Sequence, residues 1–130
     1  MENKCVLKLE RLFFQNIEFK RIGFRNDNAP EFELATMISQ NDEKLYKVAV
    51  KIQGQKKDEY EISVEINGIF GFSGTDGVSD ELKKKMISTN AVAILMPYLR
   101  SEISLLTAQP ETESIVLPPF NIASLMNQEK

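Results

Sequence analysis

Apolar and polar side chains alternate in four segments of the chain, as they do in β-strands that bury one face. The segments cover residues 5–19, 32–39, 45–54 and 59–72. One face of the first segment carries Leu7, Leu9, Phe13, Ile17 and Phe19. Leu12 and Phe14 fall on the opposite, mainly polar face, where they are expected to expose apolar surface.

The connections between these segments indicate how the strands pair. Asn26-Asp27-Asn28-Ala29-Pro30 is a strong turn signal between the first and second segments. The later segments are joined by short connections, such as residues 55–58. These favour antiparallel neighbours, because parallel neighbours need a long crossover. A single sheet of about four strands has one apolar face that other elements must cover.

The last third of the chain supplies helices for that cover. Ser79 followed by Asp80 and Glu81 predicts a helix start with an acidic first turn. Residues 88–90 offer a second cap before a longer helix, residues 91–107. Pro97 is expected to kink or divide that helix. Its first two turns are almost entirely apolar, so we expect it to be buried by the sheet on one side and by a second subunit on another.

The patterns together predict an α+β fold with a four-stranded antiparallel sheet and helices packed on one face. After the longer helix, residues 117–119 (Leu-Pro-Pro) predict an extended stretch, and residues 120–126 form a short amphipathic tail. The 130 residues suit a single domain, 1–130, with the sheet at about 5–72 and the helical part at about 79–128.

Composition excludes many classes of enzyme. The chain has no histidine, so neither a Ser-His-Asp site nor a histidine-containing zinc site can form. Its net charge of −3 argues against binding of nucleic acid. Cys5 is the only cysteine and fits a reducing compartment. With no long apolar run and no visible secretory signal, we expect a cytoplasmic protein without membrane insertion, cofactor or metal.

Two features could still carry chemistry, and each has a simpler explanation. The glycine-rich stretch 68–77 lacks the spacing of a phosphate-binding loop and is expected to bend the fourth strand. Glu59, Glu61 and Glu65 alternate along that strand and are expected to be a solvated face. They could instead form an acidic docking patch for a basic partner.

Several apolar side chains lie outside the predicted buried faces. Surface of this kind usually marks a partner or ligand groove, or a subunit interface, and we favour that interpretation over ordinary core. The residues are Leu12, Phe14, Ile22, Phe24, Met37 and Phe72.

Three stretches resemble the SecB family. Residues 68–70 are similar to its "GIF" strand end, residues 94–103 (ILMPYLRSEI) to its "LFPYAREC-I" helix, and residues 117–125 (LPPFNIASL) to its "L-P-VNF-AL" segment. Residues 17–19 and 28–30 also look similar, so the resemblance spans the whole chain. It implies a protein-transport chaperone, not an enzyme, whose grooves hold unfolded polypeptides without ATP. It also implies that first strands pair across a dimer and that helices join dimers into a homotetramer.

The resemblance has two departures that bear on partners. Secretory members dock on the SecA motor through acidic side chains, and the matching positions here are Asn16, Lys20 and Ser63. The chain also ends at Lys130 without the longer polar tail of many members. A role in protein export with SecA and a role as a chaperone dedicated to one partner, such as an antitoxin, both remain open. A small ligand-binding protein or hydrolase is the alternative from another class, and it predicts a closed polar pocket.

The expected sites follow from these hypotheses. Unfolded or precursor polypeptides are expected to bind at Leu9, Phe13, Phe32, Leu34, Ile38, Tyr98, Ile122, Leu125 and Met126. The homo-oligomer, a dimer or a tetramer, is expected to form through Leu12, Phe14, Ile94, Leu95 and Leu99.

Overall fold

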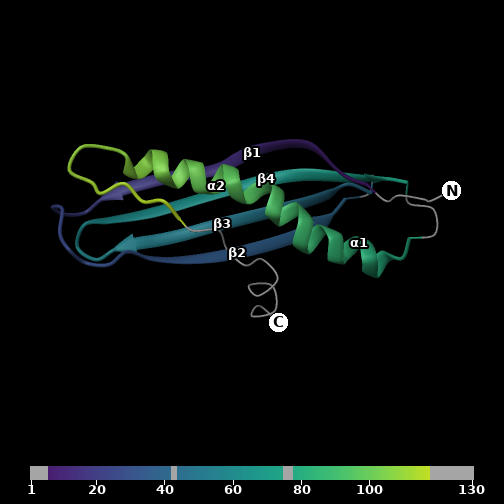
Figure 1. Ribbon diagram of the computed structural model, residues 1–130, viewed down its shortest axis with the longest axis horizontal. Coiled ribbons are helices and arrows are strands. Elements are labelled where there is room, and N and C mark those ends of the chain that lie inside the picture. The colour runs from purple at the N-terminus through teal and green to yellow at the C-terminus, as the bar shows by residue number, and fades with distance from the viewer. Residues whose placement is uncertain (1–5, 42–43, 75–77, 118–130) are drawn as a thin grey trace.

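The computed structural model describes residues 6–41, 44–74 and 78–117. Its strands are β1 (Val6–Arg21), β2 (Glu31–Gln40), β3 (Tyr46–Lys56) and β4 (Tyr60–Ser73). They form one antiparallel sheet in the order β1-β4-β3-β2 (Figure 1). Strands β2, β3 and β4 follow one another as a meander, whereas residues 22–30 cross from one edge of the sheet to the other. The predicted four-stranded antiparallel sheet is confirmed.

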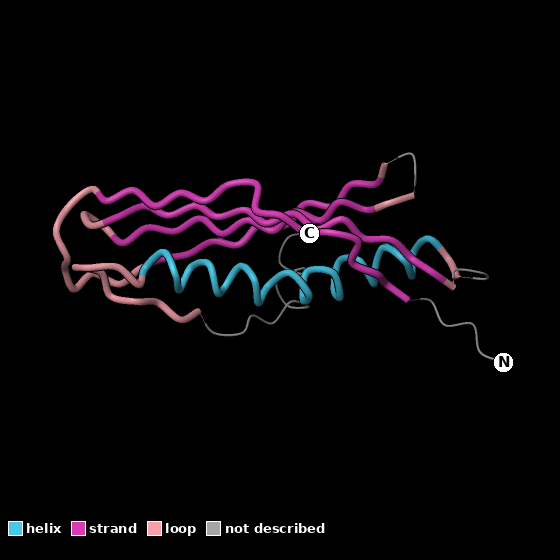
Figure 2. The backbone as a smooth tube through the Cα atoms, turned by 90° about the horizontal axis from the view of Figure 1, so that it is seen from above, coloured by secondary structure: helices cyan, strands magenta, loops and turns pink. Residues whose placement is uncertain are grey.

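The helices lie on one face of this sheet, which we call the inner face (Figure 2). Helix α1 (Asp80–Met86) begins at Ser79, whose hydroxyl accepts a hydrogen bond from the Leu82 N–H, as predicted. It continues through a π-helical segment, η1 (Ile87–Ala91), into α2 (Val92–Thr107). The predicted second cap at residues 88–90 is therefore wrong, and Pro97 lies inside α2 without ending it. None of the described helices has the length and apolar composition needed to span a membrane.

The core lies between α2 and the two central strands. Inward side chains of β3 and β4 pack beneath the buried side of α2. Gly68 is needed where α2 crosses β4, because a Cβ there would lie 2.6 Å from the Phe70 ring and 2.9 Å from Leu95. The fully buried apolar residues include Val48, Val50, Ile52, Val64, Ile66, Phe70, Leu95, Leu99 and Ile103.

Two β-bulges decide which side chains of β1 face the helices. The register with β4 shifts between Leu9 and Arg11. After this shift Leu12 and Phe14 point to the inner face and pack against the core, while Phe13 turns outward. The expectations that Phe13 shares a face with Leu9, and that Leu12 and Phe14 interrupt the polar face, are therefore wrong.

A second bulge, between Phe14 and Asn16, restores the original phase. Ile17 and Phe19 are then register partners of the inward Val64 and Ile62, on the face predicted for them. Because the two extra residues cancel, only the middle of β1 departs from simple alternation.

Glu59 fastens the crossing segment 22–30 to the turn between β3 and β4. Its carbonyl accepts hydrogen bonds from the N–H groups of Ile22 and Gly23, at 2.8 and 3.1 Å. Its carboxylate accepts the Asn26 N–H at 2.8 Å and lies 3.0 Å from the Lys56 ammonium. This carboxylate is fully buried, so the expected solvated face of Glu59, Glu61 and Glu65 does not include Glu59.

The environment of Glu59 keeps it charged. Burial alone would raise the pKa of its carboxyl, but the Asn26 N–H, Lys56 and Arg21 outweigh burial and lower that pKa. The neighbouring Tyr60 hydroxyl has the opposite shift, because burial and the charges of Glu59 and Glu113 raise its pKa to about 12. Arg21 also bonds the Glu111 carbonyl at 3.0 Å and the Thr112 hydroxyl. Three loops are thus joined at this end of the sheet.

Candidate functional site

Strand β2 provides a half-covered apolar surface at one edge of the sheet. Its inward residues Phe32, Leu34 and Thr36 are half-buried, and Ile38 is 36% exposed. We call these four residues the β2 shelf. Helix α2 packs over β4 and β3 and makes at most marginal contact with β2. The shelf is therefore a part of the inner face that the described helices leave half-covered, as they also leave Ile17 of β1, which is 44% exposed.

The β2 shelf is also preorganised by its neighbour strand. Phe32 is the register partner of Gly54 in β3, and a Cβ on that glycine would lie 2.3 Å from the Phe32 ring. The ring thus lies on bare backbone, which fixes its position at the sheet edge. Strand β2 pairs only with β3 among the described strands, so its outer edge offers a row of backbone groups for a further strand.

Three of the residues predicted to bind polypeptide therefore lie together, namely Phe32, Leu34 and Ile38. Leu9 is on the same inner face but belongs to β1, at the other edge of the sheet. Phe13 is 41% exposed on the opposite, outer face. The other predicted binding residues, Ile122, Leu125 and Met126, lie outside the described residues.

Tyr98 belongs to a separate apolar stripe on α2. It is 47% exposed and shares one side of the helix with Ile94 and Leu105. The chain that follows α2 binds the other side, where Ser104 donates to the Ile115 carbonyl and Arg100 to the Leu117 carbonyl. In Figure 1 this returning chain runs on the side of α2 nearer β3 and β2, so Tyr98 does not join the β2 shelf.

The residues predicted to form an oligomer interface also do not lie on one common surface. Leu95 and Leu99 are fully buried between α2 and the sheet, so they belong to the core of the single chain and the expectation for these two is wrong. Leu12 and Phe14 are half-buried against the core. Ile94, 36% exposed, is the member of this set with the most surface on the outside of α2.

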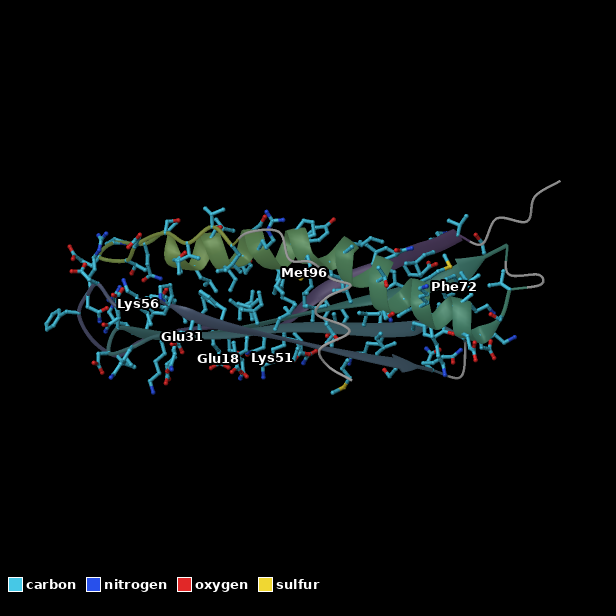
Figure 3. All side chains as sticks on the ribbon, turned by 60° about the horizontal axis from the view of Figure 1, so that its bottom comes forward. Glu18, Glu31, Lys51, Lys56, Phe72 and Met96 are labelled. Atoms are coloured by element: carbon cyan, nitrogen blue, oxygen red, sulfur yellow. The ribbon has the colours of Figure 1, made fainter. Side chains whose placement is uncertain are left out.

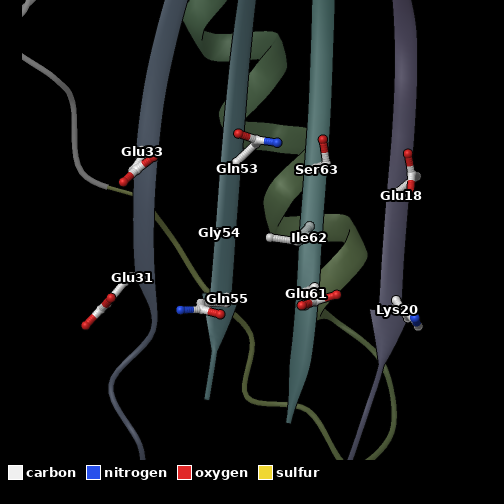
Figure 4. Close-up of a pocket in the computed structure, with 10 residues that line it drawn as sticks. All are labelled: Glu18, Lys20, Glu31, Glu33, Gln53, Gly54, Gln55, Glu61, Ile62 and Ser63. Carbon is white, nitrogen blue, oxygen red and sulfur yellow. The ribbon is translucent and has the colours of Figure 1, made fainter. Parts of the chain in front are cut away.

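The outer face of the sheet is polar at one end. Figure 3 shows Glu18 and Lys51 on the side of the sheet away from α2. An open depression of about 450 Å³ lies there, and Figure 4 shows its side chains coming from all four strands. They include Glu18, Lys20, Glu31, Glu33, Gln53, Gln55, Glu61 and Ser63. This grouping was not predicted from the sequence, although the outward Glu31 and Glu33, two residues apart in β2, are a signal for it.

The positions matched to motor-docking acids lie at this end of the outer face. Asn16 donates a hydrogen bond of 3.4 Å to the Ser63 hydroxyl, and Lys20 is the register partner of Glu61. These three positions therefore present an amide, a hydroxyl and an ammonium group. The acidic groups present are instead carried by β2, β4 and Glu18.

The polar groups do not form a recognisable reaction centre. Within residues 6–41, 44–74 and 78–117, no three side chains of the His, Cys, Asp or Glu type are placed to hold a metal ion. The polar depression is open along the sheet, unlike the closed pocket that the hydrolase alternative predicts.

Known proteins resemble this chain over nearly its whole length. The model of the family "Preprotein translocase subunit SecB" matches residues 2–130. An uncharacterised protein of Methanocaldococcus jannaschii is 30% identical, over 95% of this chain and 84% of its own length. The protein-export protein SecB of Alcanivorax borkumensis is 25% identical, over 99% of this chain and 88% of its own.

A solved structure shares the fold. It is a SecB-like chaperone of Mycobacterium tuberculosis in complex with a peptide from the HigA1 antitoxin. The TM-score is 0.70 at 12% identity, covering 88% of this chain and 91% of that one. Since the family model spans nearly the whole sequence and the fold agrees, this chain belongs to the SecB family.

Proposed function

We propose that this protein is an ATP-independent holding chaperone that binds non-native polypeptides along β2. The observation that carries the proposal is the β2 shelf, an apolar surface beside a sheet edge that no described strand covers. An extended client can add to this edge as a strand, so main-chain hydrogen bonds supply affinity that depends little on sequence. Its alternate side chains then pack on Phe32, Leu34 and Ile38.

Family membership supports the same role. Relatives named as protein-export SecB proteins match this chain over nearly its full length. Holding needs no reaction centre, which agrees with a sequence without histidine. A dimer or tetramer would place several β2 shelves on one assembly, and a long client could then bind more than one of them.

The proposal is tested by aggregation of an unfolded client without nucleotide. At stoichiometric ratio the protein should suppress light scattering, and Leu34→Asp should remove most of that effect because it places a charge on the β2 shelf. Ala35→Asp, which places the same charge on the exposed outer face of the same strand, is the matched control and should retain it. Failure of the unmodified protein to hold any client would exclude the general role.

A chaperone dedicated to one partner, such as an antitoxin, is the second candidate. It is favoured by Asn16, Lys20 and Ser63, which replace the acids expected for docking on SecA. The related fold bound to an antitoxin peptide is consistent with it. This candidate predicts one tight complex on co-purification from the native host, together with weak holding of unrelated clients. An export role predicts binding to SecA instead, which can be measured directly with the purified motor.

A further inference from the structure

The residues of the β2 shelf do not all have the same kind of neighbour in β3. Three of them have fully buried, branched register partners, which are Ile52, Val50 and Val48. The register partner of Phe32 is Gly54, which has no side chain (Figure 4). A glycine within a strand often marks a place where another group approaches the backbone closely. Strand β3 therefore supplies a side chain beside three positions of the shelf and none beside the fourth.

The Phe32 ring takes the space that Gly54 leaves. A Cβ at Gly54 would lie 2.3 Å from the Cδ1 atom and 2.5 Å from the Cε1 atom of the ring, far inside contact distance. One edge of the ring thus lies directly on the β3 backbone. Leu34 cannot lean in the same direction, because the buried Ile52 side chain occupies the equivalent place. Phe32 therefore leans toward the core and away from the free edge of β2.

This lean affects a strand that adds at the free edge of β2. Directly opposed residues on one face of a strand pair have Cβ atoms roughly 5 Å apart, so their side chains share the same space. The client side chain opposite Phe32 meets a residue whose ring lies over β3, whereas those opposite Leu34 and Ile38 meet side chains that have not moved aside. Helix α2 packs over β4 and β3, so the described helices reach β2 only marginally. We call the position opposite Phe32 the wide position.

We propose that the wide position selects clients by the size of one side chain, and that Gly54 is the residue that determines this selection. The favoured client is an extended segment in which one bulky apolar side chain alternates with smaller apolar ones. The proposal rests on the proposed function, because the same surface holds the client. Main-chain pairing along β2 stays tolerant of sequence, and the wide position adds a preference at a single place.

The expected preference is modest. A hydrophobic pocket discriminates by about 10- to 200-fold between ligands that differ by one methylene group. The wide position lies at the edge of the sheet, so only part of a client ring is removed from water there. We therefore expect a preference of about tenfold for Phe over Ala at this position, at the lower end of that range.

Binding of two fluorescent peptides to the full chain tests the selection. Both peptides alternate Val and Ser, and they differ at one central Val, which is replaced by Phe or by Ala. The Phe peptide should bind about tenfold more tightly, because it can align its ring with the wide position. Gly54→Ala pushes the Phe32 ring toward the free edge and should reduce this ratio to about twofold, while affinity for the Ala peptide changes by less than about threefold. Gly71→Ala, whose Cβ meets only movable side-chain ends, is the matched control and should keep the ratio.

An exchange of size within the protein separates the role of Gly54 from a general effect on stability. Phe32→Val removes the ring atoms that a methyl group on residue 54 would meet, so Gly54→Ala combined with Phe32→Val should restore a ratio of at least about fivefold. The new methyl group would lie 3.0 Å from the Glu31 carbonyl oxygen in both variants, so that contact cannot explain a difference between them. The double variant also provides the test if Gly54→Ala alone does not fold.

Two results would overturn the proposal. In one, Gly54→Ala weakens binding of both peptides equally and keeps their ratio; in the other, the double variant discriminates no better than Gly54→Ala. If the original protein suppresses client aggregation but binds the two peptides equally, the size selection is wrong and the holding function stands. If it neither suppresses aggregation nor binds either peptide, both are wrong.

Discussion

The inner and outer faces of the sheet are built from the same four strands, but the inner face forms the core and the outer face is mostly exposed. Inner side chains are apolar, close-packed and mostly inaccessible, as Val48, Val64 and Phe70 show. Outer side chains are more exposed and largely polar, and several glutamates gather at one end of the face. The fold therefore depends on one face, while the other is free to determine partners. The β2 shelf lies between these cases, because it belongs to the inner face but is left half-covered.

The largest difference should appear when one apolar side chain is shortened on each face. Leu99→Ala removes a fully buried side chain and should lower the free energy of unfolding by about 3 kcal/mol through lost burial and a cavity. Met37→Ala, on the exposed outer face, should change it by less than about 0.5 kcal/mol. Urea denaturation measures both. Equal losses would mean that the two faces do not differ as described.

Glu59 allows the same comparison between a buried and an exposed charged side chain, because its carboxylate is fully buried. Glu59→Gln leaves Lys56 buried without its counter-charge and should lower the free energy of unfolding by about 3 kcal/mol. Glu61→Gln, on the exposed outer face, is the matched control and should have little effect. Similar stability of the two variants would contradict the role assigned to the buried pair.

Acid unfolding gives the same contrast as a function of pH. The pKa of Glu59 is lowered in the folded protein, so its contribution is present above its ordinary value of 4.5 and is lost as the pH falls through the folded-state pKa. The original protein should therefore lose more stability than Glu59→Gln when the pH is lowered below about 4.5. Denaturation curves at several acidic pH values would show the two proteins converging; parallel curves would refute the lowered pKa.

The smallest expected difference concerns two glycines of β4. Gly68→Ala points a methyl group at Phe70 and Leu95 and should cost about 1–2 kcal/mol through overpacking. Gly71→Ala would bring its Cβ to 3.2 Å from a Leu45 methyl group and 3.4 Å from the Glu10 carboxylate, both at the ends of side chains that can move. Its cost should be below about 1 kcal/mol. Thermal unfolding of the two variants decides whether the inner face is the tighter one.

Much of the fold follows from local pattern. Alternation located all four strands to within a few residues, and Ser79 marked the start of the helices. The pattern failed in the middle of β1, because a period-2 reading has no place for an inserted residue. The intervals of three residues from Leu9 to Leu12 and from Phe14 to Ile17 are the signal of the two bulges.

The candidate site was less accessible from sequence. Phe32, Leu34 and Ile38 could be predicted as one surface because a single strand carries them. Leu95 and Leu99 were predicted to lie in an oligomer interface but are buried against the sheet. Because the first turns of α2 are apolar on all sides, their sequence does not indicate which side packs on the sheet. Glu59 looked like one more outward acid, because its burial arises from loop contacts with Asn26 and Lys56 that are distant from the strand pattern.

The paired bulges of β1 give this strand two places where its length can change without a change of face. Glu10 and Gln15 have no register partner in β4, so removal of either one would leave every other residue of β1 opposite the same partner. Removal of both would produce a regular strand in which Leu12 and Phe14 still point inward and Phe13 still points outward. In evolutionary terms, the two bulges are the positions of this edge strand where a single-residue deletion acts as a local change.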